Sequence, residues 1–516
     1  MRINYFYDAA RIQEPGGDAE YRRMLRRAGV NTLWLAGAYS GRLQAGVSQL
    51  RQAADALRQE GFDVGAVSIP VGHPGNSLNP EDDTLDLSIP AAWRYRIGMD
   101  GKPVYHCADI ESVMIAENRR LMEELASAGV SAVFYDDDLR MGEWGVQMGG
   151  CFCEQCIAAF NAATGRHETR ETLLRGLSEG RDPALCRDWS AELCRKMGRL
   201  TDALAAPGPR SGVMVMHAGD ERHGIDLPAL SAAHPDMLYR VGEAHFCDDD
   251  YAAPYHRASI WCSILQHLAL MRGHETFSET TVFPPRALRP DYLLGKARLA
   301  LAAGVDHIFY MSGTWRMSPD YWDALARGVD GLRDLAGTME GAARIYPVHV
   351  ANGTAGGLCE RLQPPLLPFL SGIPCRPVRG GDGDEPADVL LFFGAYRITD
   401  EWAAKFPGYQ AVVLDETAWD YNREYTSLHG GNLIRAPFAA DDTARHGEAL
   451  RRLVREVATQ PMPMASGAAA VPVWLEGGQV MVFSLENDPV EVELTYGNQT
   501  PCRLRLQPAG FEGRQS

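Results

Sequence analysis

Short apolar segments alternate with amphipathic stretches along the first 340 residues of the chain. Eight of these segments are rich in β-branched or aromatic residues and short enough to be buried strands. The stretches between them repeat apolar residues at helical spacing, and several end at a glycine, which favours a left-handed helix cap. Eight such repeats in about 320 residues predict a (β/α)8 TIM barrel. The predicted strands cover residues 4–7, 32–36, 64–70, 132–135, 212–217, 238–242, 275–280 and 307–311, with helices over 19–27, 43–61, 112–129, 188–205 and 291–304.

The pattern changes after Gly341. Predicted strands over 344–351, 388–393 and 411–414, with helices from residue 400 and over 445–458, indicate a flavodoxin-like α/β domain. A Pro-rich and Gly-rich patch, 374–386, interrupts this domain, and residues 460–470 are typical of a linker. Period-two alternation over 471–475, 479–485, 490–496 and 502–506 then predicts a small C-terminal antiparallel β domain. The expected domains are residues 1–340, 341–462 and 463–516.

The composition is that of a globular protein, with 46% hydrophobic and 23% charged residues among 516. A formal net charge of −17 disfavours nucleic acid and anionic membrane surfaces as partners and favours a small, weakly charged ligand. The amino terminus lacks the apolar core of a secretory signal, and no run of about 18 apolar residues occurs. We therefore expect a cytoplasmic protein.

Three of the eleven cysteines form a Cys-x-Cys-x-x-Cys motif, Cys151, Cys153 and Cys156, just after the fourth predicted strand. Cys107, in the preceding connection, is the candidate for a fourth thiolate. Four thiolates suit a tetrahedral Zn²⁺ in a closed, structural site, which would hold the long loop after the fourth strand. The alternative is that these are unlinked, partly buried thiols.

Carboxylates follow two predicted strands. Asp136, Asp137 and Asp138 end the fourth strand, and Glu279 ends the seventh. In a closed barrel these strand ends face each other across the mouth, where chemistry occurs in this fold. A carboxylate pair across such a gap is the machinery of glycoside hydrolysis. The alternatives are a helix cap or solvated loop for the Asp run, and a strand-end salt bridge for Glu279.

Aromatic, histidine and acidic residues follow the other predicted strands and are the expected substrate contacts. A flat indole stacks well on the apolar face of a sugar ring, and carboxylates and imidazoles bond to its hydroxyl groups. Each of these residues by itself is more often structural. The predicted contacts, together with Asp136, are Tyr39, His73, His217, Glu243, His245 and Trp315.

With these features the chain resembles the family 42 glycoside hydrolases, the clan A β-galactosidases, over its whole length. The segment from Cys151 to Cys156, followed by Ala158-Ala-Phe160, is similar to that family's zinc-ligand segment, with Cys107 at the position of its upstream ligand. The resemblance implies a homo-oligomer, a trimer built through the flavodoxin-like domain. It also implies that Glu279 is the nucleophile. The family's acid/base glutamate follows an asparagine, and Asp137-Asp138 replaces that pair here.

We therefore predict an exo-acting, β-galactosidase-like glycoside hydrolase that cleaves a terminal sugar, with Glu279 as nucleophile and Asp138 or Asp137 as acid/base. The retaining reaction is expected, although the shorter Asp widens the carboxyl separation towards the roughly 6.5–9.5 Å of inverting enzymes. One alternative is a metal-dependent barrel hydrolase or isomerase that uses His73, His217, His245 and the Asp run. The other is a carbohydrate-binding barrel without catalytic activity.

Overall fold

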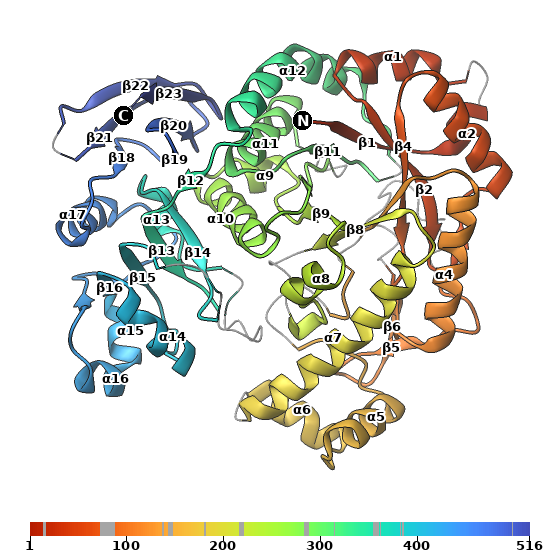
Figure 1. Cartoon of the computed structure of the whole chain (residues 1–516), viewed down its shortest axis with the longest axis horizontal. Helices are drawn as coiled ribbons and strands as arrows, with labels where there is room; N and C mark the ends of the chain where they lie inside the picture. The colour runs from red at the N-terminus through yellow and green to blue at the C-terminus, as the bar shows by residue number, and fades with distance from the viewer. Residues whose placement is uncertain are drawn as a thin grey trace. The chain divides into compact units, whose positions relative to one another are not determined.

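The computed structural model of the chain describes residues 1–13, 17–72, 88–136, 139–142, 148–179, 182–215, 221–282, 288–313, 315–353, 361, 363–381, 383, 386–497 and 499–515. These residues form two compact units (Figure 1). The first consists of Met1–Glu243, Leu270–Pro290 and Asp306–Asp330. The second consists of Ala244–Ala269, Asp291–Val305 and Gly331–Ser516. Among the described helices, none is long and apolar enough to cross a membrane.

The first unit contains the predicted TIM barrel. Its eight main strands are all parallel and lie in the order β10-β9-β8-β7-β4-β2-β1-β11. Two parallel bridges, Phe277 to His307 and Thr281 to Met311, connect the two ends of this path and close the barrel. The strands are β1 (Ile3–Tyr7), β2 (Thr32–Tyr39), β4 (Asp63–Ile69), β7 (Ala132–Tyr135), β8 (Arg210–Val215), β9 (Leu238–Val241), β10 (Thr276–Phe277) and β11 (Ile308–Tyr310).

A layer of aromatic side chains fills the barrel interior. The ring centroids of Trp34 and Phe134 lie 4.6 Å apart, and those of Phe134 and Phe277 lie 5.1 Å apart. Phe309 lies 5.7 Å from Trp34 and completes the contact across the barrel. Because strand side chains alternate, the residue two positions after each of these rings also faces inward, one level nearer the strand ends. Asp136 and Glu279 occupy such positions, after Phe134 and Phe277.

Helices and a long insertion connect the strands of the first unit. The loop after β4 leads into a hairpin of β5 (Tyr95–Ile97) and β6 (Pro103–Ala108), and the connection after β7 carries three helices, α5 to α7. The short β3 (Arg42–Leu43) folds back on β2, where the sequence predicts the start of a helix. The helices are α1 (Ala19–Arg27), α2 (Val47–Gln59), α4 (Ser112–Ser127), α5 (Glu154–Thr164), α6 (Arg170–Glu179), α7 (Pro183–Ala205), α8 (Leu227–Ala233) and the first part of α12 (Pro319–Met339), with short 3-10 turns at Ala9–Gln13 and Glu221–His223.

The second unit includes a five-stranded parallel sheet in the order β14-β13-β15-β16-β17. Numbered along the chain this is 2-1-3-4-5, the flavodoxin-like order, so the predicted fold class is confirmed. Its strand β14 lies inside the Pro-rich and Gly-rich patch, where the sequence predicts no strand. The elements are β13 (Val348–Ala351), α13 (Leu367–Leu370), β14 (Cys375–Val378), β15 (Val389–Phe392), α14 (Asp400–Lys405), β16 (Ala411–Leu414), α15 (Glu416–Tyr421), α16 (Arg423–Leu428), β17 (Leu433–Arg435) and α17 (Gly447–Val457), with a 3-10 turn at Phe406–Gly408.

Two antiparallel sheets end the chain, in the orders β12-β19-β20-β23 and β18-β21-β22. Strand β18 forms within the predicted linker. Met464 and Ala465 are buried there, and Ala465 packs into the core of this β domain. The second unit also contains α9 (Asp248–Tyr251), α10 (Pro254–Leu270) and α11 (Pro290–Ala303), except for the residues at their ends that belong to the first unit. The strands are β12 (Arg344–Ile345), β18 (Pro463–Ser466), β19 (Ala470–Leu475), β20 (Gln479–Ser484), β21 (Val490–Tyr496), β22 (Cys502–Leu506) and β23 (Phe511–Gln515).

Candidate active site and cysteine cluster

A buried ion pair lies at the carboxyl end of the barrel strands. The carboxylate of Asp136, directly after β7, contacts the guanidinium of Arg240 in β9, and both side chains are almost fully buried. Arg240 also lies over the ring of Phe309, 5.1 Å from its centroid, and donates to Oγ1 of Thr281 at 3.3 Å. Because Arg240 neutralises Asp136, this carboxylate is suited to organise the site rather than to transfer a proton.

Glu279 and Glu243 bind each other's backbone at the ends of β10 and β9. The backbone N–H of Glu243 donates to Oε2 of Glu279 at 2.7 Å, and the N–H of Glu279 donates to Oε1 of Glu243 at 2.9 Å. The two residues are only 4% and 1% exposed. This reciprocal pair fixes the orientation of both carboxylates, and a fixed carboxylate inside a barrel mouth is what a nucleophile or base requires.

Tyr39 is buried at the end of β2, where a register irregularity between Ala36 and Tyr39 interrupts the pairing with β4. Burial raises the pKa of the Tyr39 phenol well above its usual value, and the negative charges of Asp136 and Asp8 raise it further. The hydroxyl therefore stays protonated at neutral pH, as a hydrogen-bond donor among carboxylates.

Trp315 and His245 lie in different environments. Trp315 is half-buried after β11, where its backbone N–H donates to the carbonyl of Ser312 and its ring meets Tyr321 edge-on at 6.1 Å. His245 belongs to the second unit, where Nε2 lies 3.4 Å from Oγ of Ser259. Burial, together with the charges of His256 and Lys296, lowers the pKa of His245 to about 4. His245 is therefore neutral at pH 7.

Four of the predicted site residues lie outside the described part of the chain. They are Asp137 and Asp138, the candidates for the acid, and His73 and His217, two of the expected substrate contacts. The described site thus consists of Asp136, Arg240, Glu243, Glu279 and Tyr39.

The cysteine motif forms a compact cluster at the start of α5. Cys153 caps this helix by accepting the N–H of Cys156 at 3.4 Å, and Sγ of Cys151 accepts the N–H of Ile97 at 3.3 Å. Sγ of Cys151, Cys153 and Cys156 and a carboxylate oxygen of Asp109 all lie within 4.8 Å of one another. Three thiolates and one carboxylate are an acceptable donor set for a tetrahedral zinc ion.

Two cationic side chains contact this cluster. Nζ of Lys196 donates to Oδ1 of Asp109 at 2.9 Å and to Sγ of Cys156 at 3.2 Å, and Arg94 donates to Oδ2 of Asp109 at 3.0 Å. Burial lowers the pKa of Lys196, but Asp109 and Cys156 outweigh this effect and raise it, so the ammonium group stays charged. Arg94 also pairs with Glu111 at 2.5 Å, and each of the three cysteines and Asp109 offers one ligand atom to the cluster. The donor set therefore fits zinc.

Cys107, predicted as the fourth ligand, lies at the end of β6. Its buried thiol points to the carbonyl oxygen of Ala108, 3.6 Å away, and the fourth member of the cluster among the described residues is Asp109. Sequence reasoning missed Asp109 and Arg240, because an Asp near a cysteine or an Arg inside a strand carries no periodic signal. The position of Asp109, two residues after Cys107, was the one available hint.

The fold and the site define a three-part class: a TIM barrel with carboxylates at its mouth, a flavodoxin-like sheet and a terminal β domain. No family model matches the sequence, and no curated protein matches it. Similar folds are found among solved structures, and their low sequence identities mean that the likeness concerns the fold. Over the whole chain this fold is the one predicted from the resemblance to family 42.

Three of these structures match nearly the whole chain. A β-galactosidase from Rahnella sp. R3 is 14% identical with a TM-score of 0.66, covering 100% of this chain and 98% of that one. Gan42B, a GH42 β-galactosidase from G. stearothermophilus, is 11% identical with a TM-score of 0.67, covering 99% and 97%. The α-L-fucosidase isoenzyme 2 from Paenibacillus thiaminolyticus is 11% identical with a TM-score of 0.61, covering 96% and 92%.

Proposed function

We propose that the protein is an exo-acting glycoside hydrolase that removes a terminal sugar from a small glycoside or oligosaccharide. The observation that carries the proposal is the buried carboxylate of Glu279, held in place by the Glu243 backbone at the barrel mouth. The solved structures with this three-part fold are named as β-galactosidases and an α-L-fucosidase, which supports a sugar substrate.

In this proposal Glu279 attacks the anomeric carbon while Asp138, or Asp137, gives its proton to the departing glycosidic oxygen. The covalent glycosyl-enzyme is then hydrolysed by a water that the same Asp deprotonates, so the anomeric configuration is retained. Glu243 keeps Glu279 oriented, and Tyr39 and Trp315 contact the sugar. The ion pair of Asp136 with Arg240 forms part of the substrate site.

The test is a panel of aryl galactosides, fucosides, glucosides and xylosides, followed by NMR of the first-formed anomer of any product. Glu279→Gln should lower kcat/KM by roughly 10³-fold or more, whereas Glu123→Gln, an exposed helix carboxylate, should leave it unchanged. Retention of the anomer supports Glu279 as nucleophile, and inversion makes it the base. If the folded protein cleaves no glycoside, or if Glu279→Gln is fully active, the proposal is wrong.

We further propose a structural zinc ion held by Cys151, Cys153, Cys156 and Asp109. Such an ion would tie the start of α5 to the segment after β6 and stabilise the insertion beside the barrel. Metal analysis should find one zinc per chain, and Cys151→Ser should lose it together with thermal stability. The zinc content of the Asp109→Asn and Cys107→Ser variants identifies the fourth ligand, because the variant that lacks this ligand should lose the metal. Full zinc content in the Cys151→Ser and Cys156→Ser variants would rule the site out.

We also propose that the chain forms a homo-oligomer, with a trimer as the expected state. Two large side chains of the flavodoxin-like part, Tyr421 in α15 and Leu428 in α16, are 55% and 81% exposed and are available to a partner subunit. Light scattering on the purified protein should give three times the chain mass of 56.6 kDa. The Leu428→Asp variant should be smaller, and a monomeric wild-type protein would contradict the proposal.

A further inference from the structure

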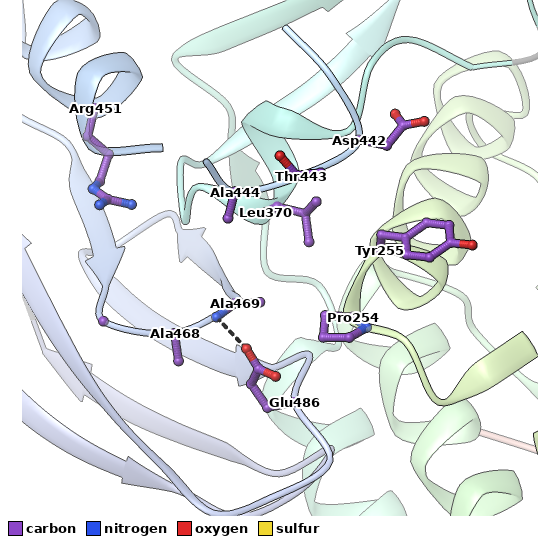
Figure 2. A pocket seen from close by; sticks show the side chains of 11 residues that line it. Pro254, Tyr255, Leu370, Asp442, Thr443, Ala444, Arg451, Ala468, Ala469 and Glu486 are labelled. Atoms are coloured by element: carbon purple, nitrogen blue, oxygen red, sulfur yellow. Dashed lines mark hydrogen bonds between the residues drawn. The ribbon is translucent and has the colours of Figure 1, made fainter. Parts of the chain in front are cut away.

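A pocket lies within the second unit (Figure 2), whereas the residues proposed for catalysis belong to the first unit. Its volume is about 520 Å³, which is within the usual range of small-molecule sites, roughly 300–1,000 Å³. Residues from three regions far apart in the sequence form its walls. They are Pro254 and Tyr255 at the start of α10, Leu370, Asp442, Thr443, Ala444 and Arg451 of the flavodoxin-like part, and Gly467, Ala468, Ala469 and Glu486 of the β domain.

Two carboxylates in this pocket are held in fixed positions. Oε1 of Glu486 accepts the N–H of Ala469 at 3.0 Å, the bond drawn in Figure 2, and Oδ1 of Asp442 accepts the N–H of Leu366 at 3.1 Å. The second oxygen of each carboxylate makes no other hydrogen bond within the described chain. Each therefore offers an acceptor of defined position to a ligand, without the entropy cost of ordering a free side chain.

The single cation of the pocket is already neutralised. Nη2 of Arg451 donates to Oε2 of Glu448 at 2.7 Å, and Nη1 donates to the carbonyl of Ser371 at 2.9 Å. With Asp442 and Glu486 left uncompensated, the pocket repels phosphate, sulfate and carboxylate ligands. The two carboxylates belong to none of the metal-competent groups of three or more among the described residues, so a bare metal ion is also a poor occupant.

The remaining walls are apolar or aromatic. Pro254, Leu370, Ala468 and Ala469 offer small apolar surfaces, and Thr443 adds a hydroxyl group. Tyr255 is 43% exposed, and its ring lies tilted by 49° against that of His256 at a centroid distance of 3.9 Å. Figure 2 shows Tyr255 and Asp442 on the same side of the space and Glu486 below them. The ligand must therefore combine hydroxyl donors with apolar C–H faces and carry no negative charge.

We propose that this pocket binds a small neutral saccharide, a mono- or disaccharide, as a second carbohydrate site of the protein. The sugar's hydroxyl groups donate to Glu486 and Asp442, and an apolar face of its ring lies on Tyr255. An aromatic face with oriented acceptors is a general solution for sugars, because a pyranose presents C–H groups on one side and hydroxyl groups at its edge. A cage for an organic cation needs several aromatic rings, and one is present here.

The experiment is photoaffinity labelling of the full-length protein with diazirine-bearing glycosides of D-galactose, D-glucose and L-fucose, mapped by mass spectrometry. At least one probe should label the peptides that contain residues 442–451, 467–469 or 486. Tyr255→Ala should reduce this labelling about tenfold, and Glu486→Gln several-fold. Tyr105→Ala, which removes an exposed tyrosine of the first unit, 72% against 43% for Tyr255, serves as the control and should have no effect.

Competition decides the ligand class. The free sugar should displace the probe, whereas spermidine and phosphate should not. Absence of labelling at these peptides, equal labelling in the Tyr255→Ala variant, or displacement by spermidine would overturn the proposal. Labelling at this pocket does not depend on turnover, so the outcome stands apart from the test of glycosidase activity.

Discussion

Arg240 controls the electrostatics of the barrel mouth, since its guanidinium is the cation that contacts buried Asp136. Replacing it with Met should leave the carboxylate buried without a partner and lower the free energy of unfolding by about 3–5 kcal/mol. The double variant Arg240→Met/Asp136→Leu removes both charges and should recover much of this loss. Urea unfolding monitored by circular dichroism measures the free energy of unfolding of the single and the double variant. A single variant as stable as the wild type would show that Asp136 is solvated.

Glu243, predicted as a substrate contact, exchanges hydrogen bonds with Glu279, and we propose that it also positions that residue. Glu243→Gln keeps an oxygen that can accept the N–H of Glu279 and removes a neighbouring negative charge, which favours ionised Glu279. If the protein hydrolyses glycosides, the acidic limb of its kcat/KM profile should move to lower pH with little change in KM. Glu243→Ala should instead lower kcat about 10–100-fold, because the backbone N–H of Glu279 loses its acceptor and the strand end that carries Glu279 is less well fixed. An unmoved pH profile with intact kcat in both variants would assign Glu243 to structure alone.

Two isolated bridges connect β10 and β11, and His307 forms one of them. Its Nδ1 accepts the backbone N–H of Arg2 at 3.0 Å, and its Nε2 contacts Oε1 of Glu275 at 2.6 Å. Burial lowers the pKa of His307 from 6.5 to about 3, and the positive charge of Arg2 adds to this effect. The folded protein therefore holds this ring neutral.

This lowered pKa predicts the pH dependence of stability. Between about pH 6.5 and pH 3 the unfolded chain binds a proton at His307 that the folded chain does not. The stabilisation is complete above that window and falls with decreasing pH, by up to about 1.4 kcal/mol per pH unit. Urea unfolding at pH 7.5, 6 and 5 should show this slope, and His307→Gln should reduce it. His429→Gln, on an exposed histidine, should not change the slope.

Strong hydrophobic periodicity predicted most helices and strands. Two strands with weak periodicity were not predicted, for physical reasons. The barrel strands alternate apolar runs with helices, so their number and order followed from periodicity. Strand β14 contains Pro377, and β18 begins at Pro463. Because proline is typical of loops and linkers, neither strand was predicted. They form because most of their side chains are buried and because tertiary pairing outweighs local propensity.

The terminal β domain is joined to α10 and α11 within the second unit. Buried Arg257 donates to the carbonyl of Leu485 at 3.0 Å and to Oδ1 of Asn487, which also accepts the hydroxyl of Tyr292. Asn487→Ala should therefore lower the free energy of unfolding by about 1.5–3 kcal/mol, as expected for bonds to a charged group. Asp488→Ala, its exposed neighbour, is the control. Equal stability of the two variants in urea would contradict this role.

The sequence could predict the fold class and the strand ends at which carboxylates gather, because both follow from periodicity and from the rules of the barrel. It could not predict that Arg240 neutralises Asp136 or that Glu243 orients Glu279. Both contacts depend on which side chains meet between different strands, and a single sequence does not show these long-range contacts. Likewise, an apolar helix face such as that of α10 shows that something covers it, but not which segment does so.

The assignment of α10 and α11 to the second unit has a consequence for synthesis of the protein. Residues 244–269 and 291–305 leave the ribosome long before Leu485 and Asn487, the partners of Arg257, have been translated. A nascent chain that ends near residue 340 must therefore hold these helices with Arg257 and their apolar faces unsatisfied. Completion of the second unit therefore has to wait until the residues around Leu485 and Asn487 have been translated.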